Sequence, residues 1–384
     1  MIAVERSYDA TATPAPGRLL FLFAGGGTGG HLFPGIAVAE ELRRRRAATG
    51  ILFVGSERPI DQRILAQSGF ETAPLPTESL ATLKRAPWRF AWRMGRALRI
   101  ACRLLRDRRP AAVIGLGGFA SGPIVWAASR QRIPVVLLEQ NVIPGRATRW
   151  LSRWAETVCV SFDETIERLA PRYRPRCRTT GNPVRREIAA MASGKCRENS
   201  AESRRPTLLV LGGSLGSRSL NALMTAFAGA SQASLTGWRI VHQAGDEADA
   251  VRGRYPAAGL DVDVRPFLDD MPAELRQADL VVGRAGATTL AEMACAGLPA
   301  VLVPYPHAAD DHQRANAEAY VRGGGAVMVL ERGETSQTLA EFTAALRTLL
   351  QDEARRRAAA EAMRSLSRPG AATEVADLLE QIAR

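Results

Sequence analysis

The sequence is poor in lysine and cysteine. Only two of its 51 basic residues are lysines, Lys84 and Lys195, and the other 49 are arginines. Its five cysteines are scattered and odd in number, and no two of them form a CxxC pair. This usage argues against a disulfide framework and against a zinc site, so we expect free thiols in a reducing compartment.

Long apolar runs are also scarce. The uncharged stretch at residues 111–129 has membrane-spanning length, but it is broken by Gly115, Gly117, Gly118, Gly122 and Pro123. We expect a strand, a glycine loop and a helix start there rather than a spanning helix. Residues 1–17 lack a charged-then-apolar signal pattern, and we expect them to form a loose tail.

The remaining composition is that of a globular protein. The 384 residues are 46% hydrophobic and 23% charged, and at about 150 residues per domain they suffice for two or three domains. With 51 basic and 39 acidic residues the formal net charge is +12. A surplus of this size indicates an anionic partner, which could be nucleic acid, a membrane surface or a phosphorylated ligand.

Short apolar runs alternate with longer amphipathic stretches in two series, which predicts parallel strands joined by crossover helices. The runs of the two series lie at residues 19–24, 51–54, 112–116, 135–138 and 157–161, and at 207–211, 239–242, 262–265, 280–282 and 300–303. Helices are expected at 34–46, from about 219, and after Pro369-Gly370. The fold class is therefore α/β, with two Rossmann-like domains facing a cleft. We predict a tail (1–17), an N-terminal domain (18–183), a linker (184–206), a C-terminal domain (207–369) and a C-terminal helix (370–384).

Three glycine-rich loops follow predicted strands: the first glycine loop (25–31), the second (115–123) and the third (212–217). The first contains a formal GxGxxG, which alone is weak evidence for a dinucleotide site. Such a site also needs an acidic residue near the end of the second strand, and that residue could only be Glu57. One or two glycines would suffice for a tight turn. Five in six positions, before a helix start, favour a phosphorylated ligand close to the backbone.

Seven segments, in this order, resemble one family: GGGTGGH (25–31), GLGGFASGP (115–123), EQNVIPG (139–145), TGNPVR (180–185), LGGSLGS (211–217), PFLDDM (266–271) and the long RAGATTLAEMACAGLPAVLVPYPHAADDHQRANA (284–317). The family is that of the bacterial UDP-N-acetylglucosamine transferases of peptidoglycan lipid synthesis (the MurG family). The resemblance implies a GT-B fold. It also implies inverting transfer of N-acetylglucosamine from UDP-N-acetylglucosamine to undecaprenyl-pyrophosphoryl-N-acetylmuramoyl-pentapeptide (lipid I), forming lipid II. No cofactor and no metal are implied.

The resemblance places the donor on the C-terminal domain. Glu292 would accept hydrogen bonds from the ribose hydroxyls, although Thr289 to Glu292 also reads as a helix capping box. Leu268 would bind uracil through its backbone. The remaining donor contacts would come from Arg185 at the nucleotide, Ser214 at the diphosphate, Gln313 at the sugar hydroxyls, and the helix-terminus amides of Ala287, Thr288, Thr289, Leu290 and Ala291 at the leaving phosphates.

The acceptor side would be completed by Thr28, Gly29, Gly30 and Asn141. His31 is the candidate general base, because histidine can remove a proton from a sugar hydroxyl near neutral pH. The alternative is a histidine that only packs in the first helical turn. An Asp-x-Asp at 261–263 is expected to be a solvated strand face rather than a metal ligand, since alternation turns its acids outward.

The sequence departs from the family pattern at Leu215, where glutamine is frequent, and at Leu138, where histidine is common. Alternatives to the family function are a transferase with another lipid acceptor such as diacylglycerol, a nicotinamide-dependent oxidoreductase, and a nucleotide-sugar-binding protein without activity. Binding of UDP but not NAD(P) would separate a sugar transferase from a nicotinamide-dependent oxidoreductase.

Most of the positive charge lies in residues 84–109. Ten basic residues and one acidic residue give this segment +9, which leaves +3 for the other 358 residues. Helical spacing aligns its arginines in one stripe, with tryptophans near its start. We predict docking on an anionic membrane surface, peripherally at the cytoplasmic face, through Trp88, Arg89, Trp92, Arg93 and Arg96. The alternatives are a solvated face with core tryptophans, or nucleic acid, for which no motif is present.

Overall fold

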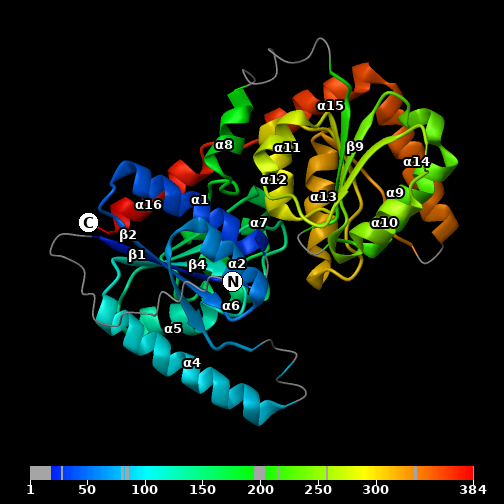
Figure 1. Cartoon of the computed structure of the whole chain (residues 1–384). Coiled ribbons are helices and arrows are strands. Elements are labelled where there is room, and N and C mark those ends of the chain that lie inside the picture. The colour runs from blue at the N-terminus through cyan, green and yellow to red at the C-terminus, as the bar shows by residue number, and fades with distance from the viewer. Residues whose placement is uncertain are drawn as a thin grey trace. The chain divides into compact units, whose positions relative to one another are not determined.

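The computed structural model describes residues 19–26, 29–78, 82, 86–193, 204–213, 216–256, 258–332 and 335–383. The chain divides into two compact units (Figure 1). Unit 1 comprises Met1–Arg185 together with Gly370–Arg384, and unit 2 comprises Arg186–Pro369. Each unit is described by itself.

Unit 1 is built on a seven-stranded sheet in which every paired strand is parallel. The strand order is β3-β2-β1-β4-β5-β6-β7, and the strands are β1 (Leu20–Gly25), β2 (Gly50–Ser56), β3 (Glu71–Leu75), β4 (Ala112–Gly117), β5 (Val135–Glu139), β6 (Thr157–Val160) and β7 (Cys177–Thr179). The helices are α1 (Gly29–Arg45), α2 (Pro59–Ser68), α4 (Pro87–Arg108), α5 (Ser121–Arg130), α6 (Arg146–Leu151), α7 (Asp163–Glu167), the 3₁₀ helix η1 (Pro171–Arg176) and α16 (Ala371–Ile382).

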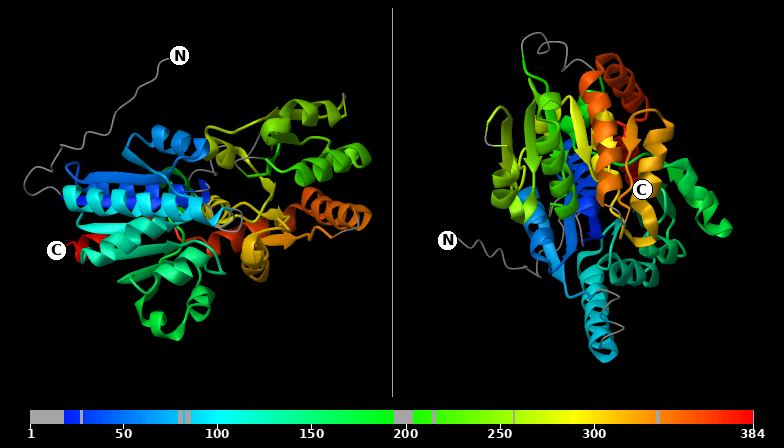
Figure 2. Two further views of the ribbon diagram at one scale, coloured as in Figure 1. Left: turned by 90° about the horizontal axis from the view of Figure 1, so that it is seen from below. Right: turned by 90° about the vertical axis from the view of Figure 1, so that its right-hand side faces the viewer.

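Helices cover both faces of this sheet. In β1, Phe21 and Phe23 pack with side chains of α1, α2 and α16, whereas Leu20 and Leu22 pack with side chains of α4 and α5. In Figure 1, α1 and α16 accordingly lie on one side of the strands and α4 and α5 on the other. The view from below in Figure 2 shows the long helix α4 with α5 beside it. Because both faces are buried, the central strands are apolar throughout.

The last helix of the chain returns to the first unit. In α16, Val375 and Leu379 are fully buried in the core shared with α1. Arg45 at the end of α1 forms ion pairs with Asp377 at 2.6 Å and Glu380 at 3.2 Å. The segment 370–384 is thus part of the N-terminal unit in space, although it follows unit 2 in sequence.

Unit 2 has a six-stranded parallel sheet. The strand order is β10-β9-β8-β11-β12-β13, and the strands are β8 (Thr207–Leu211), β9 (Arg239–Gln243), β10 (Asp261–Arg265), β11 (Leu280–Gly283), β12 (Ala300–Leu302) and β13 (Ala326–Met328). The α-helices are α8 (Arg186–Ala189), α9 (Arg218–Ala230), α10 (Ala248–Arg254), α11 (Met271–Gln277), α12 (Ala287–Ala296), α13 (His312–Arg322), α14 (Thr335–Gln351) and α15 (Glu353–Ser365). The 3₁₀ helices are η2 (Ala190–Ser193), η3 (Gln232–Leu235), η4 (Gly245–Glu247) and η5 (Ala309–Asp311).

All ten strands expected from the sequence are present, and three further strands, β3, β7 and β13, were not expected. The helix expected from residue 34 begins at Gly29, so Pro34 lies inside α1 rather than at its start. The expected linker contains α8 and η2, which belong to unit 2, and its residues 194–203 lie outside the described residues, as does the tail at 1–17.

The stretch at residues 111–129 forms β4 and the start of α5, as expected. Within the described ranges, no helix is long and apolar enough to cross a membrane. Cys102, Cys159, Cys177 and Cys295 are free thiols, and Cys196 lies outside the described residues. Burial raises the pKa of the Cys159 and Cys295 thiols to about 12, so both are poor nucleophiles.

Candidate active site

Three predicted acceptor segments meet at the carboxyl edge of the first sheet. The first glycine loop follows β1, the second follows β4, and residues 139–145 follow β5. Because β1, β4 and β5 are adjacent parallel strands, their carboxyl ends lie side by side, which is the usual ligand position in such sheets.

The first two glycine loops are packed against each other. Gly118 has φ +74°, and a Cβ built on it would overlap the carbonyl oxygen of Gly26. Gly117 has φ +98°, and a Cβ there would lie 3.0 Å from Cδ2 and 3.3 Å from Nε2 of His31. Glycine is therefore required twice in succession, once for its backbone conformation beside His31 and once for the close approach of two backbones.

His31 is the third residue of α1 and is half-buried against Gly117. It follows buried Gly29 and exposed Gly30 in the first turn of the helix. The structure thus brings His31, Gly29 and Gly30 to the sheet edge beside the second loop. Thr28 lies outside the described residues, and the role of His31 as a base stays a prediction.

Glu139 is a site residue that the sequence reasoning missed. Its carboxylate is buried at the end of β5, where Oε1 accepts from the backbone N–H of Asn141 at 3.0 Å and from its Nδ2 at 3.2 Å. Oε2 accepts from the N–H of Gly145 at 2.9 Å. One carboxylate therefore orders the whole loop that carries Asn141. The available signal was a charged residue directly after four apolar strand residues, VVLL.

A second buried carboxylate supports the first glycine loop. Asp61 lies in the first turn of α2, accepts a hydrogen bond from the hydroxyl of Ser56, and has Oδ2 2.5 Å from where a Cβ on Gly26 would stand. Nothing in the local sequence pattern marked it.

Arg185 also belongs to unit 1, and its guanidinium lies 5.0 Å from the centre of the Phe33 ring on α1. Its contact with a nucleotide stays a prediction.

The carboxyl edge of the second sheet carries the predicted donor residues of unit 2 that the structure describes. β8 leads into the third glycine loop, β11 into α12, and β12 into the segment that ends at Gln313. Buried Leu268 follows β10. Gln313 is the second residue of α13, and its Oε1 accepts from the backbone N–H of Tyr305 at 3.0 Å. Ser214 lies outside the described residues.

The start of α12 overturns the capping-box interpretation of Glu292. The helix begins at Ala287 with Gly286 as its N-cap, so Thr289 is inside the helix and cannot cap it. Glu292 is the sixth helical residue and is 5% exposed. A glycine cap has no side chain to bond the first amides, and the helix dipole adds partial positive charge there. Residues 287–291 thus form a turn suited to an anionic ligand.

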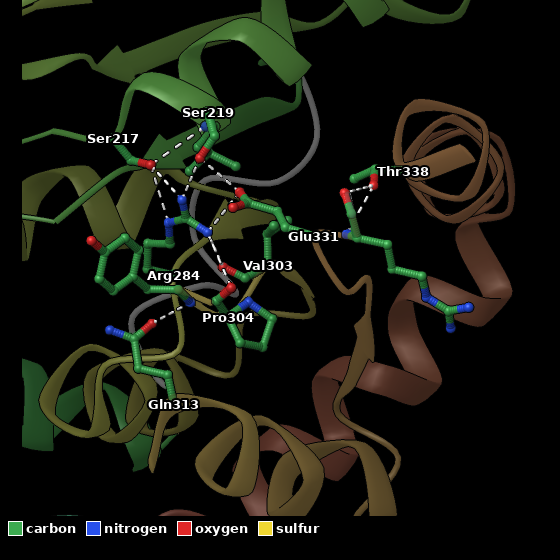
Figure 3. A network of polar contacts seen from close by, with 11 residues as sticks. Ser217, Ser219, Arg284, Val303, Pro304, Gln313, Glu331 and Thr338 are labelled. Carbon is green, nitrogen blue, oxygen red and sulfur yellow. Dashed lines mark hydrogen bonds and ion pairs between the residues drawn. The ribbon is translucent and has the colours of Figure 1, made fainter. Parts of the chain in front are cut away.

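Arg284 lies at this edge within a network of polar contacts, and the sequence reasoning gave it no role. It follows β11 and is 7% exposed. Figure 3 shows its guanidinium surrounded by the hydroxyls of Ser217 and Ser219, the carboxylate of Glu331, and the backbone carbonyls of Val303 and Pro304. These partners come from three separate segments of unit 2: the start of α9, the end of β12 and the chain at Glu331.

Comparison with known proteins gives two family models that match: the glycosyltransferase family 28 N-terminal domain over residues 21–160 and the C-terminal domain over residues 207–382. A Desulfotalea psychrophila protein is 42% identical over 86% of this chain and 89% of its own length. It is named UDP-N-acetylglucosamine--N-acetylmuramyl-(pentapeptide) pyrophosphoryl-undecaprenol N-acetylglucosamine transferase. A Geobacter sulfurreducens protein of the same name is 39% identical over 93% of this chain and 96% of its own length. The chain belongs to this transferase family.

Solved structures agree with the family. The crystal structure of Acinetobacter baumannii MurG has a TM-score of 0.73 and 28% identity, covering 95% of this chain and 99% of that one. The calicheamicin glycosyltransferase CalG4 is 20% identical with a TM-score of 0.64, over 95% and 98% of the two chains, and is similar in fold alone. The predicted GT-B architecture of two Rossmann-like domains is confirmed.

One of the two departures from the family pattern can be placed. Leu138 is buried in β5 among apolar side chains that include Phe21 and Leu116, so in this member of the transferase family the position serves core packing. Leu215 lies outside the described residues.

The Asp-x-Asp segment forms β10, and its acids differ from the expectation. Asp261 is exposed, but Asp263 is half-buried and paired with Arg239 and Arg265. The Arg265 guanidinium lowers the pKa of Asp263.

Across the part of the chain that the structure describes, no group of three His, Cys, Asp or Glu side chains could hold a metal ion. Burial lowers the pKa of His242 to about 4, and its ring is held by Tyr255 and Asn221.

Proposed function

We propose that this chain transfers N-acetylglucosamine from UDP-N-acetylglucosamine to lipid I and so forms lipid II in peptidoglycan synthesis. The observation that carries the proposal is the near full-length identity, up to 42%, with relatives named as that transferase. The geometry is compatible with a division of labour in which unit 2 binds the donor and unit 1 binds the acceptor.

On the donor side, the first-turn amides of α12 would stabilise the charge on the departing UDP. The buried carboxylate of Glu292 would accept hydrogen bonds from the two ribose hydroxyls, and the backbone at Leu268 would bind uracil. Because Oε1 of Gln313 accepts from Tyr305, its Nε2 group is oriented to donate to a sugar hydroxyl. Ser214 and Arg185 are assigned to the phosphates and the nucleotide by family resemblance.

On the acceptor side, His31 would remove the proton from the attacking hydroxyl of the N-acetylmuramoyl sugar. That oxygen then bonds to the anomeric carbon from the face opposite UDP, and the bond to the phosphate oxygen breaks, which inverts the configuration. Gly29, Gly30 and Thr28 would let the acceptor approach the backbone. Asn141, held by Glu139, would donate to it.

The decisive experiment is transfer of labelled N-acetylglucosamine to a short-chain lipid I analogue, with and without EDTA. We expect the labelled disaccharide lipid in both conditions. Absence of transfer would reject the proposed function, and loss of transfer with EDTA alone would reject metal independence. Thermal stabilisation by UDP but not by NAD(P) would exclude the oxidoreductase alternative.

The N-terminal part of α4 supports docking on a membrane. Trp88 and Trp92 are 76% and 63% exposed, which contradicts the alternative that they are core residues. No residue between 87 and 96 is buried, whereas the later part of α4 packs on the sheet. Because α4 connects two parallel strands, β3 and β4, it runs opposite to them, and its start lies at the edge of the glycine loops. Exposed tryptophans beside arginines suit an anionic bilayer surface.

The arginines of α4 do not contribute equally to this surface. Arg93 pairs with Glu57 at 2.6 Å and with Glu78 at 3.3 Å, and Arg89 pairs with Glu78 at 3.3 Å. Arg96 is exposed and lies 5.8 Å from the centre of the Trp92 ring. We therefore assign the membrane contact mainly to Trp88, Trp92 and Arg96, with Arg89 and Arg93 partly neutralised by their partners.

Replacing these three side chains should release the protein from vesicles. The variant Trp88→Ala/Trp92→Ala/Arg96→Gln is expected to bind anionic vesicles at least about tenfold more weakly in co-sedimentation, since one basic residue alone contributes about 1 kcal/mol near such a surface. Arg357→Gln is the matched control, because this exposed arginine lies on α15 in unit 2. Unchanged vesicle binding by the triple variant would refute the docking site.

A further inference from the structure

The guanidinium of Arg284 has all five of its N–H groups engaged by the protein. Nε donates to the hydroxyl of Ser217 at 3.1 Å, and Nη2 donates to Ser217 at 2.7 Å and to Ser219 at 2.6 Å. Nη1 donates to the carbonyl oxygens of Val303 at 2.9 Å and Pro304 at 3.2 Å. Figure 3 shows that the bonds of Nε and Nη2, at one end of the planar guanidinium fork, and those of Nη1, at the other end, go to different segments of the chain.

The positive charge of Arg284 is balanced inside the same cluster. Oε1 of Glu331 lies 2.9 Å from Nη1, and the hydroxyl of Ser219 donates to the same oxygen at 2.7 Å. Tyr305 covers the guanidinium, with 5.6 Å from its ring centre to Cζ. A buried guanidinium with a carboxylate partner and no remaining N–H is not arranged to bind a phosphate directly.

The two ends of the fork contact segments with different predicted ligands. Ser217 is the N-cap of α9, directly after the third glycine loop, and its hydroxyl also accepts from the N–H of Leu220. Val303 and Pro304 directly precede Tyr305, whose N–H donates to Gln313. Under the proposed function, on which this inference rests, the first segment binds the diphosphate and the second binds the sugar.

We infer that Arg284 is a positioning residue that couples the diphosphate-binding and sugar-binding segments of the donor site. Its planar fork fixes the distance between the start of α9 and the end of β12, which lie on opposite flanks of β11 in the sheet. A lysine would keep the charge but could not span both flanks, since its ammonium is a single compact point. Misplacement of a positioning segment by about 1 Å can lower turnover about 100-fold.

The test is Arg284→Lys, measured as kcat/KM and as dissociation constants for UDP and for UDP-N-acetylglucosamine. We expect kcat/KM to fall at least about tenfold. We also expect the affinity for UDP-N-acetylglucosamine to fall about fivefold more than the affinity for UDP, because the sugar-binding segment loses its tether. Arg332→Lys is the matched control: Arg332 is exposed and adjacent to Glu331, and the bonds of its backbone N–H and carbonyl oxygen go to the hydroxyl of Thr338.

Two results for Arg284→Lys would overturn the inference. If both affinities fall by the same factor, the guanidinium acts on the phosphates alone and couples nothing. If only the thermal midpoint falls while the folded variant keeps its kcat/KM and both affinities, the cluster is merely structural. Failure of the unchanged protein to bind UDP-N-acetylglucosamine would instead refute the proposed function.

Two further variants keep the inference testable if Arg284→Lys does not fold. Ser219→Ala removes one acceptor of the fork and its link to Glu331, and should shift the affinity ratio in the same direction by a smaller factor. An unchanged ratio would contradict the coupling. Glu331→Gln keeps an oxygen for the Ser219 hydroxyl but leaves the guanidinium charge unbalanced. A gain in UDP affinity in this variant would show direct action of the charge on phosphate and would reject positioning.

Discussion

Replacing His31 by alanine should lower kcat about 10²- to 10⁴-fold while changing the dissociation constant of UDP-N-acetylglucosamine by less than about twofold. The imidazole lies on Gly117 at the carboxyl edge of the first sheet, whereas the residues assigned to the donor, apart from Arg185, lie in unit 2. Loss of a general base therefore slows the chemical step without weakening donor binding. Single-turnover transfer to a lipid I analogue and titration with the donor measure the two effects separately.

The pH dependence provides the control for this variant. With His31 as the base, kcat of the unchanged protein should fall on acidification, because a protonated imidazole cannot accept the proton of the attacking hydroxyl. His31→Ala should lose that limb of the profile. A variant that loses donor affinity and kcat together would assign His31 to packing in the first turn of α1. Unchanged kcat would remove it from the mechanism.

The central strands of both sheets could be predicted because they are buried on both faces and read as continuous apolar runs. The three strands that the sequence did not reveal, β3, β7 and β13, all lie at sheet edges. Edge strands often carry polar residues and proline, as in Glu71–Leu75 with Pro74, so no apolar run marks β3. The strand β7 has only three residues, one of them Arg178. The strand β13 lies in an apolar run, AVMVL at 326–330, that the sequence reasoning did not use. The fourth edge strand, β10, was recognisable since Val262 and Val264 alternate with acids.

Helix starts at the site were less predictable. Proline is favoured in the first turn of a helix, which pointed to Pro34, yet α1 already begins at Gly29. Likewise Thr289 to Glu292 has the local form of a capping box, but the chain leaves β11 so early that the helix begins at Ala287. Both starts are set by the packing of a loop at the sheet edge, and local propensity is a weaker signal than such tertiary contacts.

Residues that organise the site through distant partners were beyond sequence reasoning. Arg284 bonds to Ser217 and Glu331, which are remote in the chain, and no spacing rule connects the three. Family resemblance supplied the residues predicted to bind the ligands, whereas positions such as Arg284 and Glu139 became visible only through their contacts.

The charge pattern of α4 was also only partly readable. The stripe of arginines could be located from helical spacing, but Glu57, Glu71 and Glu78 lie outside the helix, and no helical spacing connects them to it. Glu57 pairs with Arg93, and Glu78 pairs with Arg89. Glu71 pairs with Arg108, with 2.6 Å between the charged atoms. The unbalanced charge is therefore smaller than the +9 of the segment suggests, and the exposed tryptophans become the stronger argument for a membrane surface.

Replacing Gly118 by alanine should disrupt the acceptor side selectively. An alanine at φ +74° is strained by about 1–2 kcal/mol, and its Cβ would overlap the carbonyl oxygen of Gly26, so the first and second glycine loops must move apart. Since His31 is the last residue of the first loop and lies against Gly117 of the second, we expect kcat/KM for the lipid acceptor to fall at least about 100-fold. The dissociation constant of UDP-N-acetylglucosamine should remain within about twofold, because the residues assigned to the donor, apart from Arg185, belong to unit 2.

Gly122→Ala is the matched control for this prediction. Gly122 is the second residue of α5, four positions after Gly118, and no atom lies within 4 Å of a Cβ built on it. Alanine there should leave acceptor kinetics unchanged and raise the thermal midpoint slightly, since alanine is favoured over glycine in a helix by up to about 1 kcal/mol. If Gly118→Ala keeps the acceptor KM and kcat of the unchanged protein, the contact between the two glycine loops does not shape the acceptor site. Equal damage from both substitutions would instead show that this part of unit 1 tolerates no added methyl group, and the specific role of Gly118 would be lost.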